Sequence, residues 1–294
     1  MRIASIALLG LLLLASFGCG SERGSASGGR GLASVIHAVP GDQAVNAVDL
    51  EEARKQLGLP DDAGSLKPGR RGAANLQLAI VAATALPFAS TLDPALIKSI
   101  DLGKMQQAAT GGLIPTTRVT AMRFKGAAGD VLQKLGQAGW KQRNDVFQSP
   151  AGSRPTQFAG QGRDELVLLS PSLAALQRAR QGKAAGGRLR ALADSLRQPV
   201  RIASTLGGSG CLAAIAGGDE IQPPSGQLVV VPKAKPAADR LGHGRKFGAT
   251  RLAPAKIDGN RVVATYRGAR GRARGQIAPQ LIARFVVDEV YRCR

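Results

Sequence analysis

The chain has 294 residues, with 40 Lys and Arg against 20 Asp and Glu, and a formal net charge of +20 at pH 7. This length allows one large or two small domains with a substantial buried core, so folding does not require metals or many disulfides. Beyond the N-terminus, the longest apolar run, at 76–88, contains Gln77 and Pro87 and is too short to span a bilayer. The composition therefore excludes a small disulfide scaffold and a protein with several membrane-spanning helices.

The first residues have the pattern of an export signal. Met1 and Arg2 form a short positive start, an apolar run follows at 6–14, and small residues lead to Cys19. The run is too short for a stable transmembrane helix. We therefore expect residues 1–18 to be a signal peptide and the rest of the chain to lie outside the cytoplasm.

The segment Ala15-Ser16-Phe17-Gly18-Cys19 resembles the lipobox of bacterial lipoproteins, in which signal peptidase II cuts before a cysteine whose sulfur carries diacylglycerol. The resemblance covers the signal and the residues just after it, and it implies lipidation of Cys19 and anchoring to the cell membrane. The segment departs from the family at Ser16, where lipoproteins usually have Leu. Ser16 and Gly18 also suit signal peptidase I, which would release a soluble secreted protein instead.

The Gly- and Ser-rich composition of residues 19–31 predicts a flexible tether, because it has too few apolar groups to fold. The folded extracytoplasmic region is then expected at 32–294, with a sub-boundary near 112–116. Its first elements are strands at 33–38 and 44–48. Asp49 is a suitable N-cap for a short helix that ends near Gly58. Further helices are expected at 76–86 and from Asp93-Pro94 to 100.

Hydrophobic periodicity predicts a strand, a helix and an extended segment in the middle of the chain, followed by further elements. These are strand 118–124, helix 130–138, extended segment 140–148, strand 166–169, a helix from Pro171-Ser172 to about Arg180, and helix 189–196. Trp140 is expected to anchor the core.

A similar order recurs, more loosely, toward the C-terminus. The expected elements are strands 200–203 and 227–231, helix 237–241, a hairpin of 250–257 with 261–266, a helix from Pro279 and a strand at 284–290. The hairpin turn at Asp258-Gly259 is the strongest short-range signal in the chain.

Strands and helices alternate without the regular spacing of a doubly wound parallel sheet, and one connection is a hairpin. These features predict an α+β fold with helices and a mixed or mainly antiparallel sheet. The two rounds of elements are candidates for two loosely repeated α/β units, although no residue-level identity relates them.

Cys211 and Cys293 are the two thiols left once Cys19 carries lipid. In an oxidising envelope such a pair usually forms a structural disulfide. The alternative is two separately buried thiols that pack as small hydrophobic side chains.

Positive charge is concentrated between 233 and 274, where twelve Lys or Arg stand against two Asp. This region is the expected contact surface for anionic lipid headgroups or wall polymers. Nucleic acid is a less expected partner, because Tyr266, which stands beside Arg267, is better explained as a core side chain. The alternative is a solvated surface produced by an Arg-, Ala- and Gly-rich composition. The densest part of the region holds Arg267, Arg270, Arg272 and Arg274.

The sequence contains no convincing catalytic constellation. His37 is expected to be a structural histidine in a strand, and His243 an exposed loop residue. Glycine-rich stretches occur at 207–211, which contains Ser209, and at 217–220, but neither the P-loop nor the nucleophile-elbow spacing is present. The His and Cys residues lack zinc-site spacings, so no metal or cofactor is expected.

These features predict a membrane-anchored extracytoplasmic lipoprotein whose folded region is a non-catalytic binding or envelope-structural module. A solute-binding lipoprotein of a transport system is the alternative. A third interpretation is an envelope hydrolase, for which Ser209 and His243 are the one pair to test.

Overall fold

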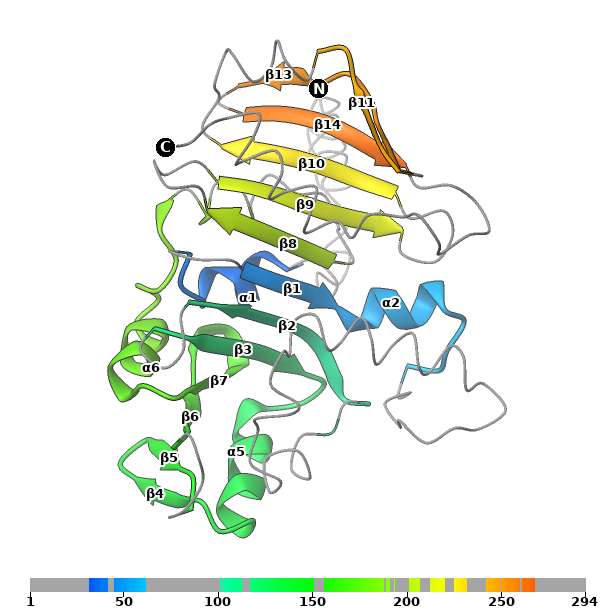
Figure 1. Cartoon of the computed structure of the whole chain (residues 1–294). Helices are drawn as coiled ribbons and strands as arrows, with labels where there is room; N and C mark the ends of the chain where they lie inside the picture. Colours follow the sequence, from blue (N-terminus) through cyan, green and yellow to red (C-terminus); the bar gives the residue numbers. More distant parts are fainter. Residues whose placement is uncertain are drawn as a thin grey trace, which may run out of the picture. The chain divides into compact units, whose positions relative to one another are not determined.

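One antiparallel β-sheet organises the fold (Figure 1). All strand pairs among the described residues are antiparallel, and helices accompany the sheet, so the predicted α+β class is confirmed. The computed structural model describes residues 32–41, 45–61, 101, 103–112, 117–150, 156–187, 189–190, 193, 201–206, 212–219, 225–231, 242–248, 250–259 and 261–267.

The helices and strands have the following bounds. The helices are α1 (Ala33–His37), α2 (Leu50–Gln56), α5 (Ala128–Gln137) and α6 (Leu173–Arg180), with a 3-10 turn at Arg163–Glu165. The first half of the sheet contains β1 (Val45–Asp49), β2 (Met105–Gly111), β3 (Val119–Phe124), β4 (Lys141–Arg143), β5 (Val146–Gln148), β6 (Phe158–Gln161) and β7 (Leu166–Ser170). The second half contains β8 (Arg201–Leu206), β9 (Leu212–Asp219), β10 (Ser225–Val231), β11 (Arg245–Phe247), β12 (Thr250–Leu252), β13 (Lys256–Asp258) and β14 (Arg261–Arg267).

The two halves of the sheet repeat one strand order. From β1 the order runs β2-β3-β7-β6-β5-β4, and from β8 it runs β9-β10-β14-β12-β11, with β13 also paired to β14. Each half thus begins with a three-strand meander, and its last long strand, β7 or β14, returns beside the third strand. The two first strands, β1 and β8, pair with each other and join the halves. The repeat is therefore one of strand order, with units that start at β1 and β8 and consist mainly of strands, whereas the sequence suggested α/β units of which the first starts at the strand 118–124.

Two hydrophobic clusters lie on opposite faces of the first half. Adjacent residues of a strand point to opposite faces, and Ala47 belongs to one cluster while Val48 belongs to the other. Side chains of α1 and α6 complete the first cluster, and side chains of α2 and α5 complete the second. Because both faces are covered, β7 is buried along its whole length.

The structure confirms several predicted elements and shows the capping and turn residues that define their ends. Asp49 Oδ1 accepts a hydrogen bond from the backbone N–H of Glu52 at 2.9 Å and caps α2. Ser172 Oγ likewise accepts the N–H of Ala175 and caps α6. The predicted hairpin turn joins β13 to β14, and Gly259 has the positive φ of 58° that such a turn requires.

The strand predicted at 33–38 is wrong, because these residues form α1. Leu32, Val35, Ile36 and Val39 are all buried and follow the i, i+3, i+4, i+7 spacing of one helix face. His37 therefore lies at the end of a helix, and the strand position predicted for it is also wrong.

The segment predicted to be extended at 140–148 is a hairpin of two short strands, β4 and β5. The strands β2 and β9 have no counterpart among the predicted elements. β9 includes Gly217 and Gly218, which belong to the glycine-rich stretch noted in the sequence at 217–220. Both strands are rich in Ala and Gly, which have weak strand propensity, and each is paired on both sides.

Some predictions lie outside the described residues: the signal and tether at 1–31, the helices at 76–86, 94–100 and 237–241, the helix from Pro279 and the strand at 284–290. In the sequence, the expected sub-boundary at 112–116 lies between β2 and β3. These strands pair with each other, and Gly111 lies opposite Val119. Residues Gly31–Arg294 form one unit. Within the described part, no helix has the length and apolar character needed to cross a membrane.

Candidate functional site

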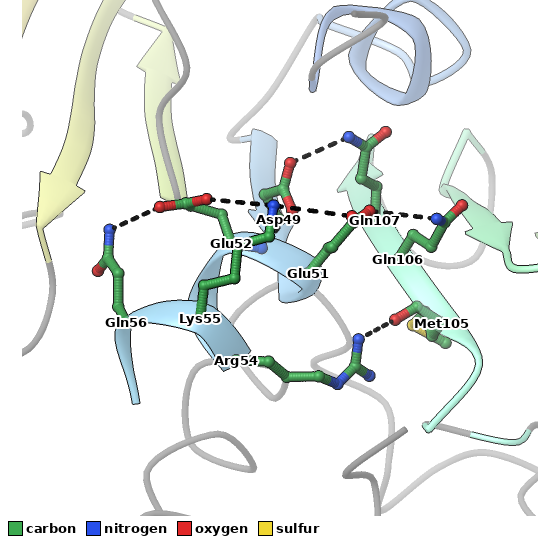
Figure 2. A network of polar contacts seen from close by, with 9 residues as sticks. All are labelled: Asp49, Glu51, Glu52, Arg54, Lys55, Gln56, Met105, Gln106 and Gln107. Carbon is green, nitrogen blue, oxygen red and sulfur yellow. Dashed lines mark hydrogen bonds and ion pairs between the residues drawn. The ribbon is translucent and has the colours of Figure 1, made fainter. Parts of the chain in front are cut away.

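A polar network joins the start of α2 to β2 (Figure 2). Besides capping the helix, Asp49 accepts a hydrogen bond at Oδ2 from Nε2 of Gln107 at 3.0 Å. Burial raises the pKa of Asp49, and its hydrogen bonds to Glu52 and Gln107 partly oppose that rise. Glu51 accepts a second bond between the same elements, from Nε2 of Gln106 at 3.1 Å. The network therefore holds α2 against the sheet.

Arg54 is the buried cation of this network, with 2% of its surface exposed. Its Nη1 donates a hydrogen bond to the carbonyl oxygen of Met105 at 2.9 Å (Figure 2). Burial lowers the pKa of Arg54, and nearby carboxylates, Asp61 foremost, counteract this effect. These hydrogen bonds of Arg54 and Asp49 satisfy groups of the protein itself, so we assign the network a structural role.

Three cations lie side by side across strands of the second half. Lys246 of β11 is directly opposite Arg251 of β12, and Arg251 is directly opposite Arg267 of β14. All three residues are exposed. Directly paired residues of antiparallel strands point to the same face, with Cβ atoms about 5 Å apart. We call this row of Lys246, Arg251 and Arg267 the cationic ladder.

The ladder is electrostatically unbalanced. Like charges directly opposite each other on a sheet are unfavourable, and an exposed anion would relieve that repulsion. Farther along β14, Arg261 has such a counterion, because its Nε donates to Asp258 at 3.0 Å. Within the described part of the chain, no ion pair links a carboxylate to any ladder cation. The ladder therefore presents uncompensated positive charge to solvent.

Arg267 is the one predicted contact arginine that the structure describes, and it forms one end of the ladder. Lys246 and Arg251 lie in the predicted contact region at 233–274, but the sequence could not place them beside Arg267, because that arrangement depends on the register of three strands. The other predicted site residues lie outside the described residues: Cys19, Cys211, Cys293, Ser209, Arg270, Arg272 and Arg274.

The remaining candidates are placed as follows. His243 lies in an exposed turn before β11, as predicted. Trp140 and Tyr266 are buried, at 3% and 4% exposure, which confirms their prediction as core side chains. In the described residues, no group of three or more His, Cys, Asp or Glu side chains is arranged to hold a metal ion.

Comparisons with known proteins give no relative on which these assignments could rest. No family model matches the chain, and no significant match is found among curated proteins or solved structures.

Proposed function

We propose that this protein is an extracytoplasmic lipoprotein, anchored through Cys19, whose folded region is a non-catalytic module that binds anionic components of the cell envelope. The cationic ladder is the observation that supports the binding function. Three exposed cations on adjacent strands repel one another unless an anion lies over them. A phosphate-bearing polymer or headgroup supplies that anion, and the ladder runs into the Arg-rich segment that follows Arg267.

Binding to a soluble polyanion tests the ladder without interference from the membrane anchor. We expect the protein, purified in detergent, to bind fluorescently labelled linear polyphosphate, with an affinity that falls steeply between 50 and 300 mM salt, since counterions compete for the same charges. Replacing all three ladder cations by Gln should weaken binding by about 100-fold, at about 1 kcal/mol per cation.

A matched variant controls for the change in net charge. Gln at Lys125, Lys141 and Arg143 removes three exposed cations from the first half of the sheet. This control variant should retain most of the affinity for polyphosphate. Equal losses in the two triple variants would show that net charge alone drives binding, and the ladder would then have no specific role.

The anchor requires its own measurement. The intact mass of the protein from a bacterial envelope, before and after reduction, should show a chain that starts at Cys19 with added lipid and one disulfide between Cys211 and Cys293. A Cys19→Ser variant should lose the lipid mass and leave the membrane fraction. A wild-type chain that starts at Cys19 without lipid would support secretion after cleavage by signal peptidase I.

A further inference from the structure

A cavity of about 590 Å³ opens in the first half of the sheet, between α5, the β4–β5 hairpin and the ends of β6 and α6. It shares no residue with the cationic ladder. Its volume lies in the range of small-molecule sites, roughly 300–1,000 Å³. The polar side chains that line it are Gln133, Gln142, Asp145, Gln161 and Arg180.

Two glycines leave part of the α5 wall of the cavity without side chains. One face of α5 carries Gly129, Gln133 and Gly136, at positions i, i+4 and i+7. Glycine lowers helix stability by up to about 1 kcal/mol relative to alanine. At Gly136 the packing explains the residue, because an added Cβ would lie 3.3 Å from the Phe147 ring. At Gly129 an added Cβ would meet nothing within 4 Å, so packing does not require glycine there, and a larger side chain at this lining position would extend into open space.

Arg180, in the polar wall of the cavity, is held by contacts with the protein. Arg180 Nε donates to the backbone carbonyl of Gln161 at 3.0 Å, and its Nη2 lies 3.7 Å from Oδ2 of Asp145. The stem of the same side chain packs against Gly160, where an added Cβ would lie 3.4 Å from Cδ. A ligand would therefore meet a guanidinium that needs little further ordering, and such preorganisation lowers the entropic cost of binding.

Glu165 connects the two sides of the cavity. Its Oε1 accepts a hydrogen bond from Nε2 of Gln161 at 3.0 Å, and its Oε2 accepts the backbone N–H of Ala128 at the start of α5. Glu165 and the preceding Asp164 both have positive φ, of 57° and 56°. Non-glycine residues in this region store backbone strain, which is concentrated at functional sites in many proteins. The strained turn thus places the carboxylate that holds Gln161 at the cavity.

The charges and hydrogen-bonding groups of the lining determine the class of ligand. One arginine and one aspartate pair with each other, so the lining has no net charge from this pair, and a charged ligand would have to separate them. The glutamine amides offer donors and acceptors together, whereas an apolar ligand would leave these groups without partners. Leu132 and Phe147 add an apolar patch. We propose that this cavity binds a neutral saccharide, with hydroxyls on the amides and the Arg180–Asp145 pair and a ring face on the apolar patch.

Direct binding measurements on the full chain test this proposal. Maltotriose, cellotriose and chitotriose are titrated separately by calorimetry, and we expect at least one to bind with a Kd of about 1 mM or tighter. Gly129→Leu places a side chain in the cavity and should weaken that binding at least about tenfold, while the higher helix propensity of Leu preserves the fold. Gly187→Leu is the matched control, because Gly187 also has open space around its Cβ and lies outside the cavity lining.

Three outcomes would overturn the proposal. They are the absence of binding by all three sugars, equal affinities of the wild-type chain and Gly129→Leu, and tighter binding of galacturonic acid than of any neutral sugar. Removal of the ladder cations should leave saccharide binding unchanged, so failure of the ladder proposal and failure of this one give different results.

Discussion

Arg251 and Arg267 lie directly opposite each other across the β12–β14 pair, with both residues exposed on one face of the sheet. Most cross-strand positions favour opposite charges or apolar contacts. Here the sheet brings two guanidinium groups together and places Lys246 beside them. Such an arrangement lowers the stability of the free protein and favours an anion-bound state. A substitution that removes the repulsion should therefore raise the stability of the protein and lower its affinity for anions.

Arg251→Glu tests this opposition. The variant replaces two like-charge neighbours by two opposite-charge pairs, so the free energy of unfolding should rise by about 0.5 kcal/mol. Affinity for polyphosphate should fall by at least about tenfold, since the charge of the central ladder position is reversed. Urea unfolding and fluorescence anisotropy measure the two effects. Lys125→Glu makes the same charge change outside the ladder, and a similar gain in stability there would contradict the assigned repulsion.

Local signals were sufficient to predict the elements whose ends are set by neighbouring residues. Asp49 was predicted as an N-cap and Pro171-Ser172 as the start of a helix, and in the structure the side chains of Asp49 and Ser172 both cap their helices. The pair Asp258-Gly259 predicts a hairpin turn, and the turn is present one residue later, because Asp258 pairs with Arg261 and Gly259 has the positive φ. In these cases, interactions between residues that are close in the sequence determine the local structure.

Elements that depend on distant partners could not be predicted in the same way. The apolar run at 33–38 fits a strand by composition, and its helical state depends on burying Val35 and Ile36 against the sheet. The Ala- and Gln-rich β2 is a strand because β1 and β3 pair with its two edges. The ladder follows from register in the same way, so the sequence could indicate a basic region at 233–274 but not the alignment of Lys246, Arg251 and Arg267 across three strands.

The raised pKa of Asp49 predicts a specific dependence of stability on pH. Because burial raises the folded-state pKa above the ordinary value of 3.8, this group adds stability below pH 3.8 that is lost as pH rises through the folded-state pKa. Asp49→Asn removes this titration and still caps α2. Its side-chain amide can also donate to Oε1 of Gln107, for which the described residues provide no partner.

We therefore expect the unfolding free energy of Asp49→Asn, relative to the wild type, to increase from pH 3 to pH 7. Asp49→Ala should show the same trend with pH and an additional loss of about 1 kcal/mol at both pH values, because it lacks a cap. Urea unfolding at the two pH values measures both effects. A relative stability of Asp49→Asn that falls toward pH 7 would mean that the ionised carboxylate is favoured by its hydrogen bonds.

Arg54 should be among the most sensitive positions for stability. Arg54→Met fills a similar volume but leaves the carbonyl oxygen of Met105 without its donor and nearby carboxylates without a cation. We expect the free energy of unfolding to fall by about 3 kcal/mol, as for other buried pairs that lose one partner. Arg178→Met, at an exposed position of α6, is the matched control. A loss below 1 kcal/mol would show that burial of the guanidinium costs as much as its contacts contribute.

The strained turn between β6 and β7 should affect both the stability of the protein and the proposed saccharide binding. Asp164→Gly should relieve the positive φ and raise the free energy of unfolding by about 1 kcal/mol relative to Asp164→Ala, which removes the same side chain but keeps the strain. The hydrogen bond from Arg123 to the carbonyl oxygen of residue 164 is a backbone contact, so both variants can keep it. If the strain holds Glu165 in place for the cavity, Asp164→Gly should also bind saccharide more weakly than Asp164→Ala. Thermal unfolding and calorimetric titration of the two variants measure these effects. If Asp164→Gly is more stable than Asp164→Ala but binds saccharide equally well, the backbone strain has no role in saccharide binding.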